Sequence, residues 1–268
     1  RCEYKLKYPS CDLLCVEMIE RMILHEGPET VAAIIAEPVP AAASIYPAPD
    51  GYLQRLREIA DKYGILLILD EVINGFGRTI NMFASEHWGV VPDIMTVAKG
   101  ITSGYVPMGA AITGPKVTRH FDSAEGRESG LNHVISFGGH AAASAAALKN
   151  IEILENEKMV ENSAEMGAYM LDGFRELMKH PIVGDARGLG MLAAVELVKD
   201  KKTREPFSPA DQMPARVTAH MMELGVIGRV AQVVEFGPPL MCGRAEIERI
   251  VDVMEKTVVW FSKEMGLG

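Results

Sequence analysis

The segment Ile65–Asp70 constrains the fold more strongly than any other part of this sequence. It reads ILLILD, five branched aliphatic residues followed by an aspartate. An apolar run without alternation is typical of a central strand in a parallel sheet whose two faces are covered by helices. Because ligands bind at the carboxyl ends of such strands, we expect Asp70 at the edge of the sheet where a ligand sits.

A second strand is predicted at Ile94–Ala98, and it ends directly before Lys99. Two neighbouring strands of one sheet would then each carry a charged residue to the same edge. Removing both charges from water costs free energy, so the pair indicates a ligand that uses both residues. Pyridoxal phosphate (PLP) fits, because its aldehyde needs a lysine amine and its ring nitrogen needs a carboxylate that keeps it protonated.

The surrounding sequence predicts alternating strands and helices. A strand at Val31–Ala36 and an amphipathic helix at Tyr52–Tyr63, stopped by Gly64, precede the apolar strand. This order is a βαβ unit, which requires parallel strands joined by a right-handed crossover. Ser10 is the expected N-cap of the first helix. The other expected elements are strands at Met108–Thr113, Met191–Val198 and Val226–Val230 and helices at Ala141–Leu154, Met159–Met178, Pro214–Leu224 and Arg244–Glu264.

Composition argues against several classes of function. The 268 residues carry a net charge of −9 without a basic run, which argues against a nucleic-acid partner. No uninterrupted apolar stretch reaches transmembrane length and no signal peptide opens the chain, so we expect a cytoplasmic protein that does not bind a membrane. The four cysteines form no CxxC pair, and His87, His133 and His140 are not spaced as metal ligands. No metal site is therefore predicted.

Four motifs, in order, give the chain its resemblance to a known family. They are AEPV at 36–39, DEVINGFGR at 70–78, PDIMTVAKG at 92–100 and SGYVPMGA at 103–110. Together they resemble the successive signatures of the class III aminotransferases, which are PLP-dependent enzymes of fold type I. The resemblance implies an α/β fold, with a mostly parallel central sheet in a large cofactor-binding domain at 1–160 and a small C-terminal α/β domain at 161–268.

The same resemblance implies that the chain is N-terminally truncated. The likeness begins at about Tyr8. Family members carry a further upstream segment, with a Gly-Ser-rich helix start that binds the cofactor phosphate and an aromatic residue that stacks on the ring. We therefore expect this chain to be a fragment, the C-terminal portion of a longer protein.

Four residues are expected to hold the cofactor by this resemblance. Lys99 would form a Schiff base with PLP and move a proton during the reaction, while Asp70 would keep the pyridine nitrogen protonated. Val72 would pack against the face of the ring. Ser136 replaces a family threonine that reaches the phosphate of the neighbouring subunit's cofactor, which implies a homodimer or a dimer of dimers. The ordinary alternatives are a solvated lysine, a capping or turn aspartate and a core valine.

Two residues are expected near the substrate. Arg229 lies in GVIGRVAQVVEFGPPL, which resembles the stretch of ω-amino acid–pyruvate aminotransferases whose arginine binds a substrate carboxylate and swings away from other substrates. A guanidinium suits this role because it holds a carboxylate through two parallel hydrogen bonds. By resemblance, Glu37 lies on the substrate side of the pocket, with a surface carboxylate as the alternative.

Three other charged residues are predicted to be structural. Glu71 should point to the opposite side from Asp70. Arg78 should fold back on a carboxylate of its own loop. Arg187 should lie in a tight turn, because glycines flank its segment on both sides.

The predicted function is transamination through the PLP Schiff base, from an amine or ω-amino acid to a keto acid, with pyruvate as the expected acceptor. Two alternatives stay open. Another class III enzyme, such as an aminomutase, a decarboxylase or a lyase, would share the motifs around Lys99, because these enzymes begin from the same substrate–cofactor adduct. The second alternative is an inactive truncated remnant, or an assembly partner without activity.

Overall fold

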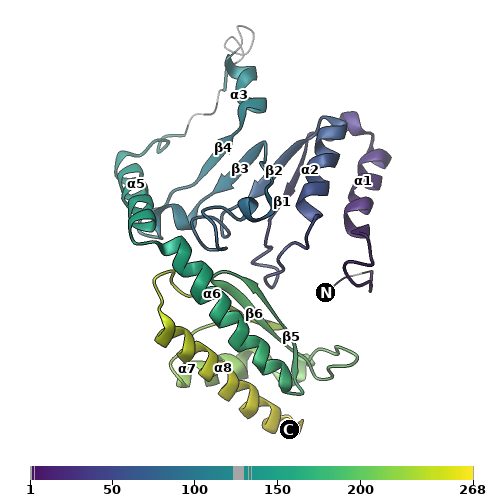
Figure 1. Ribbon diagram of the computed structural model, residues 1–268, viewed down its shortest axis with the longest axis vertical. Helices are drawn as coiled ribbons and strands as arrows, with labels where there is room; N and C mark the ends of the chain where they lie inside the picture. Colours follow the sequence, from purple (N-terminus) through teal and green to yellow (C-terminus); the bar gives the residue numbers. More distant parts are fainter. Residues whose placement is uncertain (1, 3, 123–129, 132, 134, 268) are drawn as a thin grey trace. The chain divides into compact units, whose positions relative to one another are not determined.

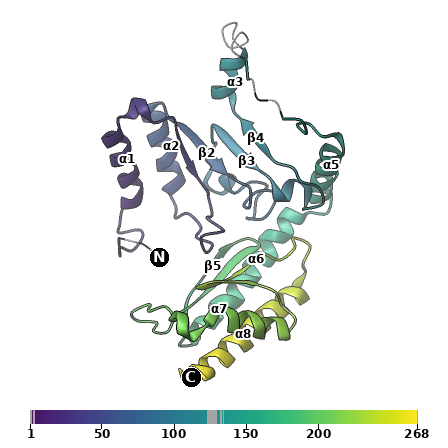
Figure 2. The same cartoon turned by 180° about the vertical axis from the view of Figure 1, so that it is seen from behind.

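The computed structural model describes residues 2, 4–122, 130, 131, 133 and 135–267, and these form two compact units. The first unit comprises Arg1–Pro38, Ala48–Phe76 and Phe83–Glu152. The second comprises Ile153–Gly268 together with two short segments, Val39–Pro47 and Gly77–Met82. Each unit contains one sheet with its own helices (Figures 1 and 2). The two segments interrupt the sequence of the first unit, yet they pack with the second.

The first unit is built on a four-stranded sheet in the order β1-β2-β3-β4. The strands β1 (Ala33–Ala36), β2 (Leu66–Asp70) and β3 (Ile94–Val97) are parallel, and β4 (Ala110–Thr113) runs antiparallel to β3. The helix α2 (Tyr52–Tyr63) connects β1 to β2. The predicted βαβ unit is therefore confirmed.

The sequence explains the bounds of α2. Leu53, Leu56, Ile59 and Ala60 are its buried face. Gly64 ends the helix in a left-handed conformation at φ 68°, where its N–H donates to the carbonyl of Ala60. A side chain would make that conformation costly, so glycine stops the helix as predicted.

The first helix begins later than its sequence predicts. The helix α1 spans Leu14–Glu26 and lies beside α2 (Figure 1). Ser10 is not its N-cap, because the Ser10 hydroxyl donates instead to the carbonyl of Lys7. That local hydrogen bond closes a turn before the helix, a common alternative use of a serine near a helix start.

The prediction that β2 is covered on both faces is wrong for the part of the chain described. Leu67 and Leu69 are fully buried, whereas Leu66, Ile68 and Asp70 on the other face are only half-buried. The edge strand β4 is exposed at every position. Within residues 4–122 and 135–267, the first unit thus has one well-covered face and one partly open face.

Further helices complete the first unit. They are the 3₁₀ helices η1 (Pro28–Thr30), η2 (Ala84–Trp88) and η3 (Lys99–Thr102) and the α-helices α3 (Pro115–Asp122) and α5 (Ala141–Asn156). The last turn of α5, from Ile153 on, belongs to the second unit. The helix α5 is rich in alanine, and among its apolar residues Ala143, Ala147 and Leu154 are buried.

The second unit has an antiparallel sheet in the order β5-β6-β8-β7. Its helices α6 and α8 run side by side, and Figure 2 also shows α7. The elements are α6 (Met159–Glu176), η4 (Leu177–Lys179), β5 (Val183–Leu189), β6 (Leu192–Leu197), η5 (Pro209–Asp211), α7 (Met213–Glu223), β7 (Arg229–Val230), β8 (Val233–Phe236) and α8 (Arg244–Glu264). The sequence patterns missed β5 and β8.

The core of the second unit depends on glycine. Every residue of β6 is buried. On α6, a Cβ at Gly167 would stand 2.2 Å from the backbone carbon of Gly190, in the turn between β5 and β6. Only glycine lets the helix approach this turn so closely, because any side chain would collide with its backbone.

Candidate active site

Three strands of the first unit end side by side on charged residues. The strand β1 is followed by Glu37, β2 ends on Asp70, and β3 is followed by Ala98 and Lys99. The register pairs Ala36 with Leu69 and Asp70 with Thr96. Because all three strands are parallel, their carboxyl ends lie at one edge of the sheet. The expectation that neighbouring strands deliver Asp70 and Lys99 to the same edge is therefore confirmed.

Asp70 is held at its strand end by the turn that follows. Its Oδ1 accepts a hydrogen bond of 2.9 Å from the backbone N–H of Val72. Its carbonyl accepts a second one, 3.3 Å long, from the side-chain amide of Asn74. The side chains of Asp70 and Val72 are both half-buried. The carboxylate thus keeps a fixed orientation while its residue stays partly open to solvent.

Lys99 begins the η3 turn in an unusual backbone conformation. Its φ is +43°, in the left-handed region that residues other than glycine rarely adopt, and its side chain is exposed. The next residue, Gly100, lies against Phe76, because a Cβ at Gly100 would stand 3.0 Å from Phe76 Cβ. The glycine-rich loop after β2 therefore contacts the turn that carries the lysine.

An asparagine that the sequence patterns missed also contacts this turn. Asn150 of α5 donates its side-chain amide to the carbonyls of Gly100 at 2.8 Å and Ile101 at 3.3 Å. The available signal is weak: one asparagine inside an alanine-rich helix, where alanine has the higher helix propensity. Its partners lie 50 and 49 residues away in sequence, so local pattern could not identify them.

Glu71 is structural, as its place next to Asp70 predicted. Its side chain is fully buried and accepts the backbone N–H groups of Ala84 at 2.9 Å and Ser85 at 2.8 Å, at the start of η2. Burial raises the pKa of the Glu71 carboxyl, although these hydrogen bonds oppose the rise. The carboxylate therefore links the end of β2 to η2.

A buried hydroxyl stands next to Asp70. Thr96 is the register partner of Asp70, so both side chains leave the sheet on the same face. The Thr96 Oγ1 is buried and has no hydrogen-bond partner within the described part of the chain. An unpaired buried hydroxyl costs about 1–3 kcal/mol, so this face is suited to a polar group from outside that part.

Two arginines differ from their predicted environments. Arg78 does not fold back on a carboxylate; its guanidinium donates to the backbone carbonyls of Met191 and Pro238 in the second unit, to which Arg78 itself belongs. Burial lowers the pKa of Arg78. Its segment is thereby tied to the turn after β5 and to the chain after β8.

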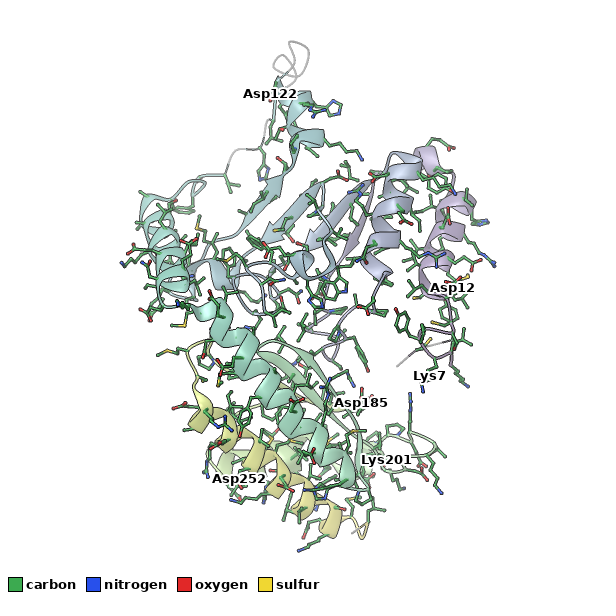
Figure 3. The ribbon with its side chains drawn as sticks, in the orientation of Figure 1. Lys7, Asp12, Asp122, Asp185, Lys201 and Asp252 are labelled. Carbon is green, nitrogen blue, oxygen red and sulfur yellow. The ribbon has the colours of Figure 1, made fainter. Side chains whose placement is uncertain are left out.

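Arg187 is structural, but it lies in β5 and not in a tight turn. Its Nη1 pairs with Asp185, labelled in Figure 3, at 2.8 Å and with Glu196 at 3.1 Å. Its guanidinium also donates to the carbonyls of Ser44 and Ile45 and stacks 3.8 Å from the centre of the Tyr46 ring. These partners attach the segment Val39–Pro47 to the sheet of the second unit.

Arg229 lies on β7 in the second unit, with 62% of its side chain exposed. Its Nη1 is 3.2 Å from Oε2 of Glu235 on β8. Burial raises the pKa of the Glu235 carboxyl, although Arg229 and Arg187 oppose the rise. One side of the guanidinium is thus paired while most of the side chain faces solvent.

The two other predicted site residues lie in the first unit. Glu37 is half-buried directly after β1. Ser136 is exposed in a turn before α5. Their predicted roles, toward substrate and toward a neighbouring subunit's cofactor, stay predictions.

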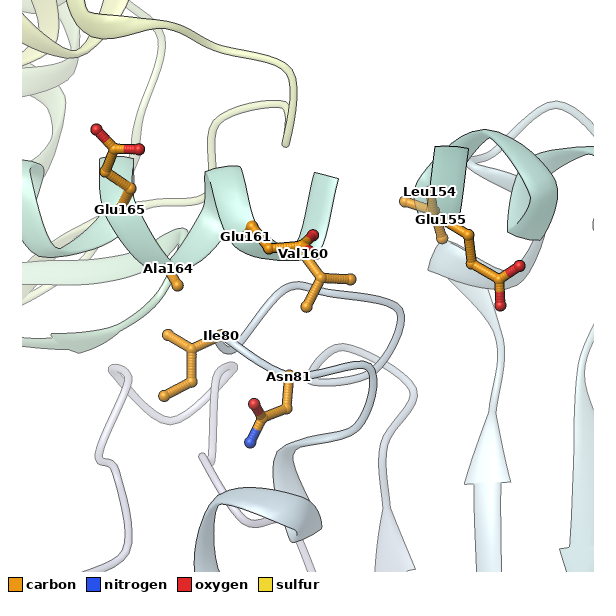
Figure 4. Close-up of a pocket in the computed structure, with 8 residues that line it drawn as sticks. All are labelled: Ile80, Asn81, Leu154, Glu155, Val160, Glu161, Ala164 and Glu165. Atoms are coloured by element: carbon orange, nitrogen blue, oxygen red, sulfur yellow. The ribbon is translucent and has the colours of Figure 1, made fainter. Parts of the chain in front are cut away.

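One pocket lies entirely in the second unit (Figure 4). It is lined by Ile80, Asn81, Leu154, Glu155, Val160, Glu161, Ala164 and Glu165. None of the predicted site residues is among these eight.

Two kinds of feature are absent from the described residues. Among them, no group of three or more histidine, cysteine, aspartate or glutamate residues is arranged to hold a metal ion. No described helix is both long enough and apolar enough to cross a membrane.

Known proteins resemble this chain over most of its length. A diaminobutyrate–2-oxoglutarate transaminase from Halomonas elongata is 40% identical over 248 residues, covering 91% of this chain and 53% of the relative. A taurine–pyruvate aminotransferase from Bilophila wadsworthia is 40% identical over 277 aligned positions, which cover 98% of this chain and 60% of the relative. An amine transaminase from an uncultivated Pseudomonas species, solved in its PLP-bound form, superposes with a TM-score of 0.92 and 37% identity over 97% of this chain and 59% of its own.

The chain spans a little over half the length of these curated relatives, from 53% to 60%. The predicted α/β architecture of PLP fold type I is confirmed by the superposition and by the parallel strands around Asp70. Residues 3–258 match the family described as aminotransferase class-III. The chain therefore belongs to the class III aminotransferase family.

Proposed function

We propose that this chain carries the lysine and the ring-binding carboxylate of a PLP-dependent transaminase. The enzyme would move an amino group from an amine or ω-amino acid to a keto acid, with pyruvate as the acceptor. The observation that carries the proposal is the parallel pairing of β2 with β3. It places the carboxyl ends of the two strands at one edge of the sheet, where β2 ends on Asp70 and Lys99 follows β3. Family membership and the taurine–pyruvate relative support it.

The residues at this edge fit PLP. When bound, PLP supplies an aldehyde that condenses with a primary amine and a ring that accepts an electron pair. Lys99 offers the amine, and Asp70 offers a carboxylate of fixed orientation. The buried Thr96 hydroxyl, which has no partner in the described part of the chain, offers a polar contact on the same face of the sheet.

Each residue then has one task. Lys99 holds the cofactor before substrate arrives, and afterwards its amine takes the proton from the substrate Cα. Asp70 keeps the proton on the ring nitrogen, because a carboxylate beside a cationic ring favours the charged form. Val72 packs against the ring face, and Glu37 lies toward the substrate.

Arg229 is proposed to bind the carboxylate of the keto acid. Most of its side chain is exposed, so a carboxylate can approach it from solvent. Among the described residues it pairs with Glu235 across the hairpin, and a planar guanidinium has donors for a second carboxylate. Amine donors without a carboxylate would leave the Arg229–Glu235 pair intact.

Assembly, location and domain roles are part of the proposal. We propose a homodimer or a dimer of dimers, in which Ser136 reaches the phosphate of the neighbouring subunit's cofactor, and a cytoplasmic location. Residues 1–160 would bind the cofactor and residues 161–268 would form the small domain. Sedimentation of an active monomer at assay concentrations would contradict the proposed oligomer. Recovery of the protein outside the cytoplasmic fraction would contradict the proposed location.

The test of function uses the complete reading frame that contains this chain, loaded with PLP. Taurine, putrescine, diaminobutyrate and 1-phenylethylamine are assayed as donors, each with pyruvate and with 2-oxoglutarate. Alanine formed in step with consumption of a donor is the expected result. Release of ammonia or carbon dioxide without a keto acid would instead identify a lyase or a decarboxylase, and an isomerised amino acid would identify an aminomutase. A protein that attaches no PLP would be an inactive remnant.

A further inference from the structure

We propose that Asn150 is a positioning residue for Lys99. Its side-chain amide, projecting from α5, fixes the η3 turn that begins with the lysine, and so fixes where the lysine amine stands. The inference rests on the proposed role of Lys99. It adds a residue that neither the motifs nor the charged sheet edge contain.

The first observation is the geometry of the contact. One amide nitrogen, Asn150 Nδ2, reaches two successive carbonyls, those of Gly100 at 2.8 Å and Ile101 at 3.3 Å. These are the two residues that directly follow Lys99. A donor shared between both carbonyls restrains the peptide planes on either side of Ile101, and hence the path of the chain as it leaves the lysine.

The second observation is that the turn needs restraint. Lys99 at φ +43° and Ser103 at φ +52° are both left-handed, one at each end of η3. Residues other than glycine keep such conformations only where surrounding contacts impose them. On one side the contact is Phe76, whose Cβ would be 3.0 Å from a Cβ at Gly100. On the other side it is Asn150.

The third observation is the placement of an asparagine within a helix. Residue 150 follows the run AAASAAALK, where alanine dominates. Asparagine has a lower helix propensity than alanine, so the sequence carries a local cost at this position. The hydrogen bonds to η3 offset that cost. Without them, the turn is free to relax toward the right-handed region, which would move the Lys99 side chain.

The test compares two asparagines that make the same kind of contact. Asn162, on α6 of the second unit, donates its Nδ2 to the carbonyls of Leu240 at 2.6 Å and Cys242 at 3.0 Å. Asn150→Ala and Asn162→Ala therefore remove equivalent hydrogen bonds, but only the first adjoins the lysine. Asn150→Asp is a third variant, similar in size but without a donor.

The readout is covalent attachment of PLP to Lys99, measured without turnover. Protein in the complete reading frame is mixed with PLP and reduced with borohydride at a series of pH values, and the labelled lysine is located by peptide mass. We expect Asn150→Ala and Asn150→Asp to slow attachment by on the order of tenfold and to shift its pH midpoint, since small displacements of a reacting group have large effects on rate. Asn162→Ala should lower the Tm without either change.

Three outcomes decide the matter. Attachment that keeps the parent rate and pH midpoint in both Asn150 variants would overturn the inference but leave the proposed function standing. Equal changes in Asn162→Ala would mean that general stability, and not the position of Lys99, was lost, which also overturns it. A parent protein that attaches no PLP to Lys99 would overturn both the inference and the proposed function. Alanine is the better helix former, so Asn150→Ala does not threaten α5 itself.

Discussion

The guanidinium of Arg229 and the buried carboxylate of Glu235 face each other across the β7–β8 ladder, 3.2 Å apart and in direct register. Arg229 is 62% exposed in its side chain, whereas that of Glu235 is 9% exposed. The pair is therefore open to solvent on the arginine side only. A substrate carboxylate that binds Arg229 must share or displace Glu235, which gives two predictions.

Arg229→Ala should raise the KM for pyruvate strongly and leave the half-reaction with 1-phenylethylamine nearly unchanged. The pair lost is the one between Arg229 and the carboxylate of pyruvate. Losing one partner of such a charge-assisted pair costs roughly 2–5 kcal/mol when the other partner stays buried. Arg229→Lys should recover part of the loss, because lysine offers a point charge and not a fork. Single-turnover kinetics on each half-reaction make the measurement. Equal losses in both halves would mean that Arg229 supports the fold and that another residue holds pyruvate.

Glu235→Gln should lower the KM for pyruvate. The substitution removes the competing negative charge and leaves the arginine available to the substrate. The arginine side of the pair is open to solvent, and a solvent-screened ion pair is worth about 0.2–1 kcal/mol, so the gain should be no more than about fivefold. The amine half-reaction is the internal control and should not change. A KM that rises, as in Arg229→Ala, would show that Glu235 holds the arginine in its binding position.

The sequence could predict the elements whose determinants are local. The apolar run Ile65–Asp70 and the helix Tyr52–Tyr63 with its glycine stop both carry their own signals. From these two and the strand before them, parallel pairing followed, and with it the shared edge of Asp70 and Lys99. One local inference failed, because apolar residues on both faces of β2 do not ensure that the described chain covers both.

What the sequence could not predict depends on partners far along the chain. The strand β5 reads VGDARGL, which resembles a glycine turn, yet its arginine is satisfied by carbonyls at Ser44 and Ile45 and by the Tyr46 ring. The same holds for Arg78, whose acceptors lie 113 and 160 residues away. No window of local sequence contains both halves of these contacts.

Asp93→Asn should reduce the dependence of stability on acid pH. Asp93 accepts from the backbone N–H of Leu67 at 2.8 Å and from Arg57 at 2.9 Å, and these contacts, against the effect of burial, lower its pKa from 3.8. A carboxyl group whose pKa is lower in the folded than in the unfolded protein stabilises the fold at pH values above the unfolded pKa. This contribution to stability is lost as the pH falls through the folded pKa.

Urea unfolding of Asp93→Asn between about pH 5 and pH 2 checks this, since that window begins above the unfolded pKa and extends well below it. The variant should be less stable at neutral pH, with a flatter loss of unfolding free energy on acidification. Asp61→Asn is the matched control, because Asp61 also pairs with Arg57, at 2.7 Å, but has 62% of its side chain exposed. Parent and Asp93→Asn curves that run parallel throughout the window would contradict the argument.

Asp70→Asn should separate cofactor binding from turnover. An amide at this position still fits the space and can accept the hydrogen bond that Val72 N–H now gives to Asp70 Oδ1 at 2.9 Å, so PLP should still attach to Lys99. It cannot hold a proton on the ring nitrogen, so the ring accepts electrons less well and kcat should fall by several orders of magnitude.

Lys99→Ala, by contrast, should abolish covalent attachment while PLP still binds weakly. Borohydride trapping and kcat, measured on both variants, distinguish the two roles. Parent turnover in Asp70→Asn would mean that the carboxylate at the end of β2 serves the turn and not the cofactor.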